Sequence, residues 1–410
     1  MRKNLILTIL ALFMAQIAWA QTPVCVTDAW SYLRNDSPVP AKKKIDDCLP
    51  ANKQNADVWL MRGNVYFRLY EYETNRIKKD TAQKKAQVYE RRFADAIDTA
   101  NKSFIKALEL NKNVQPQSGM YGPKEGQIAC GRVMYDLGIK ARSEKNYEVA
   151  YNYFLTAVKD WELTKGTPSY DKTMINLIAS VYLDVADMAN SLNRDADYKR
   201  YTLAAVNTNT EDPYPYLSMY DIYRQANDTV NCAKMLNLCM KNVPADNQMN
   251  VSGYRLDYYG LIGDIAKMTE ISDSIITKYG DKVTVVAMVA GHLVNHRQYE
   301  KTEAVLNKAL EAEPNNFDLN YQMGFRFFSE SLDHKEASEK FLNENNFNAS
   351  RTAQLAQREN MEKSYPWTLK AYEIKGDDMP TNRMLYTMCL MLGKEVPVGL
   401  KEKIDSYIEK

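Results

Sequence analysis

Apolar residues recur every three or four positions along most of the chain, in short segments separated by Gly, Asn or Pro. The clearest case is residues 283–316, in which Val286 and Leu293 belong to one apolar stripe and Leu306 and Ala309 to the next. This period is that of an α-helix with one buried face. The segment therefore predicts two helices joined by a short turn and packed along their apolar sides.

Similar helix pairs recur along the sequence, each with a small residue in the first helix and an aromatic residue in the second. The pairs are Gly63 with Phe104, Gly138 with Phe154, and Gly324 with Phe341. In the last of these, Met323 and Phe327 are assigned to the first helix and Ala337 to the second. This pattern resembles the tetratricopeptide repeat (TPR). The resemblance covers roughly residues 56–345, and it implies an all-α, right-handed superhelix of antiparallel helix pairs with a concave surface formed by the first helices.

The patterns predict four segments in the chain. They are a signal peptide (1–20), an N-terminal helical hairpin (21–55), TPR-like repeats (56–345, with an insertion at about 71–92), and C-terminal helices that form a cap (346–410). In the last segment we expect separate helical stretches before and after Pro366, and a final amphipathic helix at 400–408. No Gly/Ser linker divides the chain, so the helices are expected to form a continuous stack.

The first residues have the pattern of a secretory signal peptide. Arg2 and Lys3 precede an apolar run at 5–17, and Ala18 and Ala20 provide a small-x-small cleavage site. The run is too short to span a bilayer, and Cys25 does not directly follow the cleavage site as a lipid anchor would require. We therefore expect a periplasmic or secreted protein, cleaved near Ala20.

The cysteines divide into two groups by their spacing. Cys25 and Cys48 lie on the two sides of a turn near Ser37, so an antiparallel hairpin places them opposite each other and predicts a disulfide; two free thiols are the alternative. Cys232 and Cys239 are seven residues apart on one helix, about 10 Å along its axis, and cannot pair with each other. We expect these two, with Cys130 and Cys389, to be buried thiols.

Charge is balanced overall but not locally. The chain has 53 Lys and Arg and 52 Asp and Glu, so its composition gives no indication of a nucleic-acid partner. Basic residues concentrate in the predicted insertion: Arg76, Lys78, Lys79, Lys84, Lys85, Arg91 and Arg92. Such a segment is suited to an acidic partner or an anionic membrane surface. The alternative is a solvated extension of a helix.

The 28 tyrosines are the second candidate for partner binding. Most fall on the apolar stripes and are expected in the core. Tyr70, Tyr72, Tyr151 and Tyr214 do not, and they are candidates for the concave face.

One group of residues has the types needed for metal chemistry. His292, His296 and Glu300 are spaced four and four apart, as zinc ligands on one helical face would be. Leu293 follows the first histidine where a zinc protease has its glutamate, and Tyr299 marks the start of another helix before Glu300. We therefore expect these residues to be structural or solvent-facing, with no metal and no other cofactor.

Motifs for a nucleophile elbow, a dinucleotide site or a phosphate loop are missing from the sequence. Together with the TPR resemblance, this predicts a non-catalytic scaffold that binds a protein or peptide on a concave surface, for example in an outer-membrane or envelope complex. A binder of small ligands or glycans is the alternative, and an enzyme is the third hypothesis.

Overall fold

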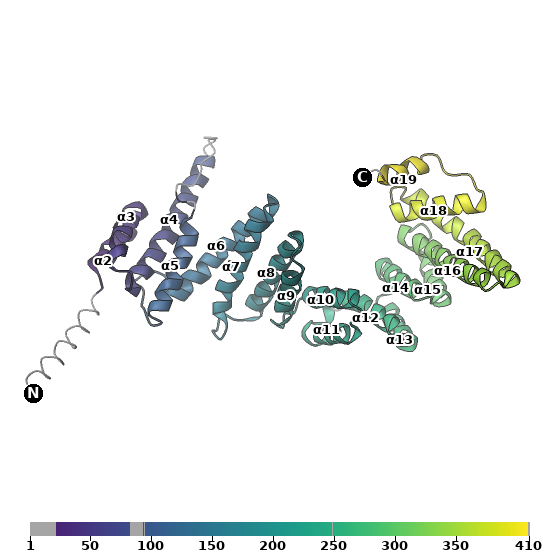
Figure 1. Ribbon diagram of the computed structural model, residues 1–410, viewed down its shortest axis with the longest axis horizontal. Helices are drawn as coiled ribbons and strands as arrows, with labels where there is room; N and C mark the ends of the chain where they lie inside the picture. Colours follow the sequence, from purple (N-terminus) through teal and green to yellow (C-terminus); the bar gives the residue numbers. More distant parts are fainter. Residues whose placement is uncertain (1–21, 83–92, 94, 248, 409–410) are drawn as a thin grey trace, which may run out of the picture. The chain divides into compact units, whose positions relative to one another are not determined.

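The computed structural model describes residues 22–82, 93, 95–247 and 249–408. All regular secondary structure in these ranges is helical, and consecutive helices form antiparallel pairs (Figure 1). The chain divides into two compact units, Met1–Pro215 and Tyr216–Lys410. The predicted signal peptide lies outside the described residues. Within the described ranges, no helix combines the length and the apolar character needed to cross a membrane.

The first unit contains the N-terminal hairpin and three further helix pairs. Its elements are α2 (Val24–Arg34), α3 (Pro38–Cys48), η1 (Leu49–Ala51), α4 (Ala56–Ala82), α5 (Ala96–Leu110), α6 (Pro123–Ser143), α7 (Tyr147–Trp161), η2 (Glu162–Thr164), α8 (Lys172–Ser191) and α9 (Asp195–Val206). The predicted Cys25–Cys48 disulfide is confirmed: it joins α2 to α3 with a Cα–Cα distance of 6.3 Å. Cys130, Cys232, Cys239 and Cys389 are buried free thiols, as expected.

Five helix pairs make up the rest of the chain. Their elements are α10 (Tyr214–Gln225), α11 (Thr229–Asn242), η3 (Ala245–Asn247), α12 (Met249–Leu261), α13 (Ile265–Tyr279), α14 (Val283–Asn295), α15 (Tyr299–Ala312), α16 (Phe317–Asn343), α17 (Phe347–Ile374), α18 (Met379–Leu392) and α19 (Leu400–Ile408). The unit boundary falls two residues inside α10.

The turns within the pairs repeat one backbone geometry. Apart from the connection of α4 to α5, each places one residue in the left-handed region, with φ between 51° and 74°: Asp36, Lys145, Asn193, Asn227, Gly263, Arg297, Asn345 and Gly393. The amide of the following residue then donates to a carbonyl five positions earlier, as Gln298 N does to Leu293 O at 2.8 Å. This is the Schellman arrangement that satisfies carbonyls at a helix end. The same device therefore closes successive pairs and reverses the chain.

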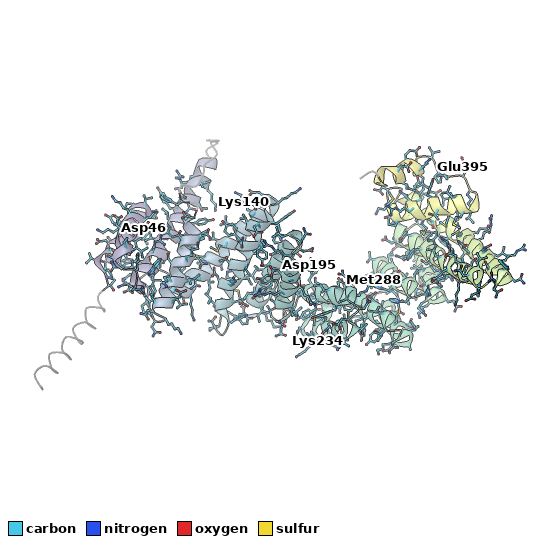
Figure 2. All side chains as sticks on the ribbon, in the orientation of Figure 1. Asp46, Lys140, Asp195, Lys234, Met288 and Glu395 are labelled. Carbon is cyan, nitrogen blue, oxygen red and sulfur yellow. A yellow bond between two sulfur atoms is a disulfide. The ribbon has the colours of Figure 1, made fainter. Side chains whose placement is uncertain are left out.

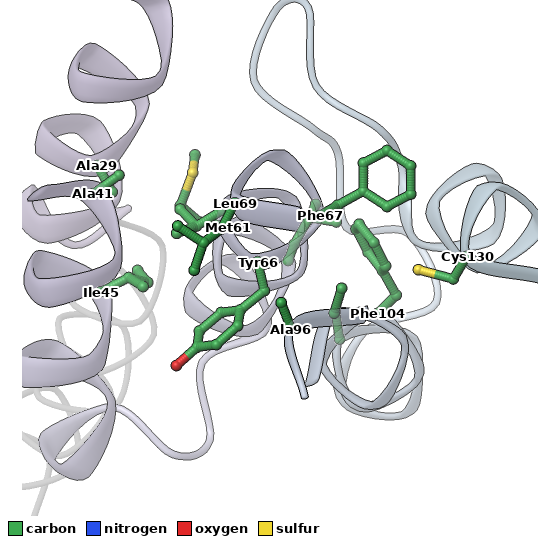
Figure 3. Packing of buried hydrophobic residues seen from close by; sticks show 14 of the residues in the cluster. Ala29, Ala41, Ile45, Met61, Tyr66, Phe67, Leu69, Ala96, Phe104 and Cys130 are labelled. Atoms are coloured by element: carbon green, nitrogen blue, oxygen red, sulfur yellow. The ribbon is translucent and has the colours of Figure 1, made fainter. Parts of the chain in front are cut away.

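Small residues let the paired helices approach, as the sequence pattern predicts. A Cβ on Gly63 would lie 2.7 Å from the Phe104 ring, and one on Gly138 would lie 2.6 Å from the Phe154 ring. Phe104 is fully buried in the core cluster of the first unit, between α4 and α6 (Figure 3). Together with the repeated turns, this packing makes the chain an all-α, TPR-like solenoid.

The prediction for residues 317–345 is wrong in one respect. Ala337 and Phe341 do not belong to a second helix, because α16 runs unbroken from Phe317 to Asn343. No Gly or Pro separates Phe327 from Ala337, so nothing in the chain forces a turn there. The partner of Gly324 is instead α17, where Ser364 Oγ donates to the Gly324 carbonyl at 2.7 Å. The predicted segment boundary at 345 and 346 thus falls within the turn of a helix pair.

Pro366 does not divide the following segment. The two expected helical stretches are a single helix, α17, with Pro366 inside it. Buried Ser364 and Thr368 flank the proline and pack against α16 at Gly324. We attribute the continuity of the helix to this packing, which outweighs the local preference of proline to end it.

Candidate functional site

A pocket of about 370 Å³ lies against α10, α12 and α14, the first helices of three successive pairs. We call it the α12 pocket. Its lining residues are Asp221, Arg224, Gly253, Tyr254, Asp257, Met288, His292 and Asn295. They belong to the second unit, in which Figure 2 marks Met288.

Helical spacing brings these side chains to one side of each helix. Asp221 and Arg224 are three residues apart on α10, Tyr254 and Asp257 three apart on α12, and His292 is four residues from Met288 on α14. Side chains at these spacings lie above one another on one face. The pocket is therefore built from three parallel rows of side chains.

Glycines on α12 bring α14 close. A Cβ on Gly253 would lie 3.1 Å from His292 Nε2, and one on Gly260 would lie 2.3 Å from the imidazole of His296. The second distance is much shorter than any real contact of a Cβ atom, so only glycine fits against the His296 ring. The two glycines thus set the positions of both histidines.

Asp257 is the centre of a polar network on the pocket wall. Its carboxylate accepts from Tyr220 Oη at 2.9 Å and pairs with Arg224 Nε at 2.7 Å. A second Arg224 nitrogen donates to the other oxygen at 3.1 Å, so the arginine holds the carboxylate with two bonds. This geometry fixes Arg224 and neutralises Asp257.

Asp221 has a different environment. Its carboxylate accepts from Tyr254 Oη at 3.2 Å, and the described part of the chain gives it no ion pair. Burial raises the pKa of Asp221, while the Tyr254 hydrogen bond and Arg224 oppose that rise. The pocket therefore contains one carboxylate with a cationic partner and one without.

The two histidines are neutral at physiological pH. Burial lowers the pKa of both His292 and His296, and the nearby Asp257 carboxylate only partly opposes it. His296 Nε2 lies 3.9 Å from Asp257 Oδ1, which is beyond hydrogen-bond distance. Within the described residues, neither His292 Nδ1 nor His296 Nε2 has a hydrogen-bond partner, although both atoms are buried.

The histidine and glutamate group singled out in the sequence does not form one site. His292 is in α14, His296 caps its C-terminal end, and Glu300 is exposed in the first turn of α15. No group of three metal-ligating side chains occurs among the residues that the structure describes. His292 lines the α12 pocket and packs against Gly253.

The basic candidates lie elsewhere. Arg76, Lys78 and Lys79 are near the C-terminal end of α4 in the first unit, where Arg76 lies 3.8 Å from the buried Glu73 carboxylate. This part of the predicted insertion is a continuation of α4. Lys84, Lys85, Arg91 and Arg92 lie outside the described residues.

The tyrosine candidates have three different environments. Tyr70 is half-buried against the core of the first unit, whereas Tyr72 and Tyr214 are 43% and 68% exposed. Tyr151 is buried between α7 and α9, where its hydroxyl donates to Asp197 at 3.1 Å. The expectation that Tyr151 lines a binding face is therefore wrong, because its ring packs edge-on against Tyr201 in the core.

The sequence pattern does not single out the carboxylates that accept from tyrosines on other helical elements. The pairs are Tyr66 with Asp46, Tyr151 with Asp197, Tyr182 with Glu162, Tyr220 with Asp257, Tyr254 with Asp221, and Tyr299 with Asp333. An arginine also binds the carboxylates of Asp46, Asp257 and Asp333. The only local signal is an arginine two or four residues from the tyrosine, which is too common to identify such a group.

Comparisons with known proteins give a likeness in fold alone. No protein-family model and no curated protein matches the chain. Among solved structures, it is similar to pilF of Pseudomonas aeruginosa (15% identity, 63% of this chain and 92% of that chain, TM-score 0.27). A TPR repeats protein from Bacteroides fragilis NCTC 9343 is 10% identical, with 80% of this chain and 98% of that chain covered and a TM-score of 0.22. Likenesses this low carry no argument about function, so the function is argued from the chain's own residues.

Proposed function

We propose that this TPR-like repeat protein is a non-catalytic scaffold that holds a protein or peptide partner at the α12 pocket. We further propose that it does so outside the cytoplasm, as a periplasmic or secreted component of an envelope complex. The observation that carries the proposal is the α12 pocket itself. The first helices of three successive pairs present polar and aromatic groups to one open cavity, and one of these groups, the Asp221 carboxylate, has an oxygen that accepts no hydrogen bond in the described chain.

A purely structural network would leave fewer groups without partners. Buried polar atoms are normally hydrogen-bonded, because an unpaired one retains its full cost of desolvation. Asp221 lines the cavity, has no ion pair within the described chain and uses one oxygen to accept from Tyr254, which leaves the other oxygen without a donor. A bound partner that supplies a hydrogen-bond donor would satisfy it. The arrangement therefore supports binding more than internal stabilisation.

The size and composition of the pocket favour a macromolecular partner over a small ligand. Its volume of about 370 Å³ is near the lower end of the range for small-molecule sites. Met288 is the one aliphatic side chain among its lining residues, so the cavity has no enclosing apolar wall. A small molecule would bury little surface there, whereas a peptide could use the pocket as one of several contacts.

The lining also offers little for catalysis. Its Asp, Tyr and His side chains are types that occur in catalytic sites, but Ser, Cys and Lys are not among the lining residues, and the Asp257 carboxylate is already held by Arg224 and Tyr220. These features support a binding role.

Export is supported by the disulfide. Cys25 and Cys48 are joined in the first helix pair, and such bonds persist in oxidising compartments. The signal-peptide pattern ending at Ala20 points the same way.

Capture from crosslinked cell envelopes tests this function. We expect a tagged wild-type chain to retain a reproducible protein partner and Met288→Lys to lose it, because a long charged side chain occupies the pocket. Met391→Lys is the matched control, since Met391 is 48% exposed on α18 and does not line the pocket. Circular dichroism checks that both variants remain helical.

Equal retention of the partner by both variants would contradict binding at the α12 pocket. Failure to capture any protein with the wild-type chain, while a glycan or other small ligand protects it from thermal unfolding, would replace the scaffold by a ligand-binding function.

A further inference from the structure

We infer that the α12 pocket receives a basic side chain, an arginine or a lysine, from an extended segment of the protein partner. The cation would pair with Asp221, next to the ring of Tyr254. This inference rests on the proposed function and specifies the chemistry of its partner. It is argued from the charge of the pocket, the hydrogen-bonding group left unused, and the size of the cavity.

The charge of the pocket is negative. Asp221, Arg224 and Asp257 are its charged lining residues, and the neighbouring His292 and His296 are neutral. One arginine thus faces two carboxylates. Because Arg224 pairs with Asp257 at 2.7 Å, the uncompensated charge is that of Asp221. Opposite charge is the complement that such a site favours.

The unused hydrogen-bonding group among the lining residues is an acceptor. Asp221 uses one carboxylate oxygen to accept from Tyr254, which leaves its other oxygen for a ligand. The guanidinium of Arg224, in contrast, already donates twice to Asp257. A ligand group rich in donors therefore fits the pocket better than a carboxylate or phosphate.

Aromatic and apolar surface is available for the stem and head of such a side chain. Tyr254 and Met288 both line the cavity, from α12 and α14 respectively. An arginine or lysine packs its methylene groups on apolar surface, and its cation is attracted to the face of an aromatic ring. Burial also raises the pKa of Asp221, and a cation beside it would reverse that effect.

A volume of about 370 Å³ accommodates one long side chain and is too small for a folded domain. The rest of the partner would then lie outside the pocket. For this reason we assign the cation to a side chain of an extended segment, with the main chain crossing the pocket entrance.

A peptide library tests the inference on the purified full-length chain. Acetylated and amidated heptapeptides would carry arginine, lysine, glutamate or alanine at the central position, within otherwise varied sequences. We expect binding peptides to be enriched in arginine or lysine at that position. Asp221→Asn removes the charge and keeps the shape, so it should weaken these peptides at least tenfold.

The matched control is Asp377→Asn, which makes the same chemical change at an exposed turn residue between α17 and α18. It should leave the affinity unchanged. Spermidine and free arginine amide form a separate arm, and both should bind more weakly than the arginine peptides because they lack the flanking contacts.

Three results would overturn the inference. Binding peptides that prefer glutamate or alanine at the centre, with affinity still lost in Met288→Lys, would retain the scaffold function and refute the basic side chain. Spermidine binding as tightly as the peptides would make the ligand a small cation. Absence of any binding peptide, together with failure of the envelope capture, would refute the proposed function itself.

Discussion

At the scale of single residues, the acidic side chains carry more of the structure than their pattern in the sequence suggests. They are spread along amphipathic helices, where the usual interpretation is a solvated face. Several instead accept hydrogen bonds from tyrosines of other elements, for example Asp46 from Tyr66 at 2.7 Å and Asp333 from Tyr299 at 2.7 Å. Burial raises the pKa of both tyrosines, and the accepting carboxylates raise it further. These hydroxyls therefore remain protonated and continue to donate at alkaline pH.

Asp160 is another acidic side chain that is buried although its position on an amphipathic helix suggests a solvated face. Its side chain is 4% exposed on α7, and Asn101 Nδ2 of α5 donates to it at 3.0 Å. Burial raises the pKa of Asp160 to about 7, although the Asn101 bond acts in the opposite direction. No local pattern predicts this, because the burial comes from helices that are distant in sequence.

The raised pKa of Asp160 makes the stability of the first unit depend on pH. In the unfolded chain Asp160 loses its proton near pH 3.8, but in the folded chain only near pH 7. Between these values the folded state binds more protons, so its contribution to stability is greatest below pH 3.8 and is lost as the pH rises to 7. We expect the free energy of unfolding of the wild-type chain to fall by roughly 2 to 3 kcal/mol between pH 5 and pH 8 through this group. Asp160→Asn stays neutral and should not show this fall.

Urea unfolding of both proteins at pH 5 and pH 8 measures this effect. The new amide can also donate to Asn101 Oδ1, a buried atom that has no partner within the described chain. Asp136→Asn is the control, because Asp136 is exposed on α6. A stability difference between Asp160→Asn and wild type that is the same at both pH values would contradict the assignment.

At the scale of helices and turns, the sequence predicts the pairs well and their ends less well. Gly63 with Phe104 and Gly138 with Phe154 pack as the TPR resemblance implies. The turns could not be recognised from glycine alone. Gly263 and Gly393 are the glycines among the left-handed residues of these repeated turns, and the others are Asp, Lys, Asn or Arg. Their conformation follows from the packing of the helices on each side.

The α16 and α17 pair shows why local pattern is insufficient. Ala337 and Phe341 match the second-helix motif in spacing, but only a turn before them would place them on a second helix, and neither Gly nor Pro lies between Phe327 and Ala337. Pro366 causes the opposite error: the proline predicts the end of a helix, but α17 continues through it. In both cases contacts between the two long helices decide the outcome.

Gly324 is the position where this pair tolerates the least change. A Cβ there would lie 2.4 Å from Thr368 Oγ1 and 3.2 Å from the Thr368 backbone nitrogen. Because neither atom can move freely, we expect Gly324→Ala to destabilise the second unit by about 1 to 3 kcal/mol. The midpoint of urea unfolding measures this change.

Gly291→Ala provides the comparison. Its Cβ would lie 3.4 Å from the flexible amide of Gln322, an ordinary contact distance. Replacing a glycine inside a helix by alanine then stabilises by roughly 0.5 to 1 kcal/mol. Equal effects of the two substitutions would show that α16 and α17 do not approach as closely as the structure indicates.

At the scale of the whole molecule, the all-α class and the TPR-like pairing follow from the periodicity of the sequence. The binding site does not. Asp221, Arg224, Asp257 and Asn295 form no motif, and only the alignment of α10, α12 and α14 places them around one cavity. His292 was identified as a candidate for another reason, its spacing from His296, and it reaches the pocket because Gly253 admits it.

We propose that this molecule is an exported helical scaffold with a polar pocket for part of a partner protein. The disulfide in the first pair and the signal-peptide pattern support its location. The basic residues of the predicted insertion remain a second proposed contact, for an acidic partner or an anionic surface. The α12 pocket is the part of the proposal that can be tested most directly.

Site-specific photocrosslinking in living cells provides that measurement, with benzoylphenylalanine placed at Asn295 or at Asn307. Both residues are exposed, but Asn295 lines the pocket on α14 whereas Asn307 is on α15, the second helix of the same pair. We predict a discrete crosslinked protein from Asn295 that is lost in the Met288→Lys background, and none from Asn307. Crosslinking from Asn307 alone, or crosslinking from Asn295 that persists with Met288→Lys, would contradict the account.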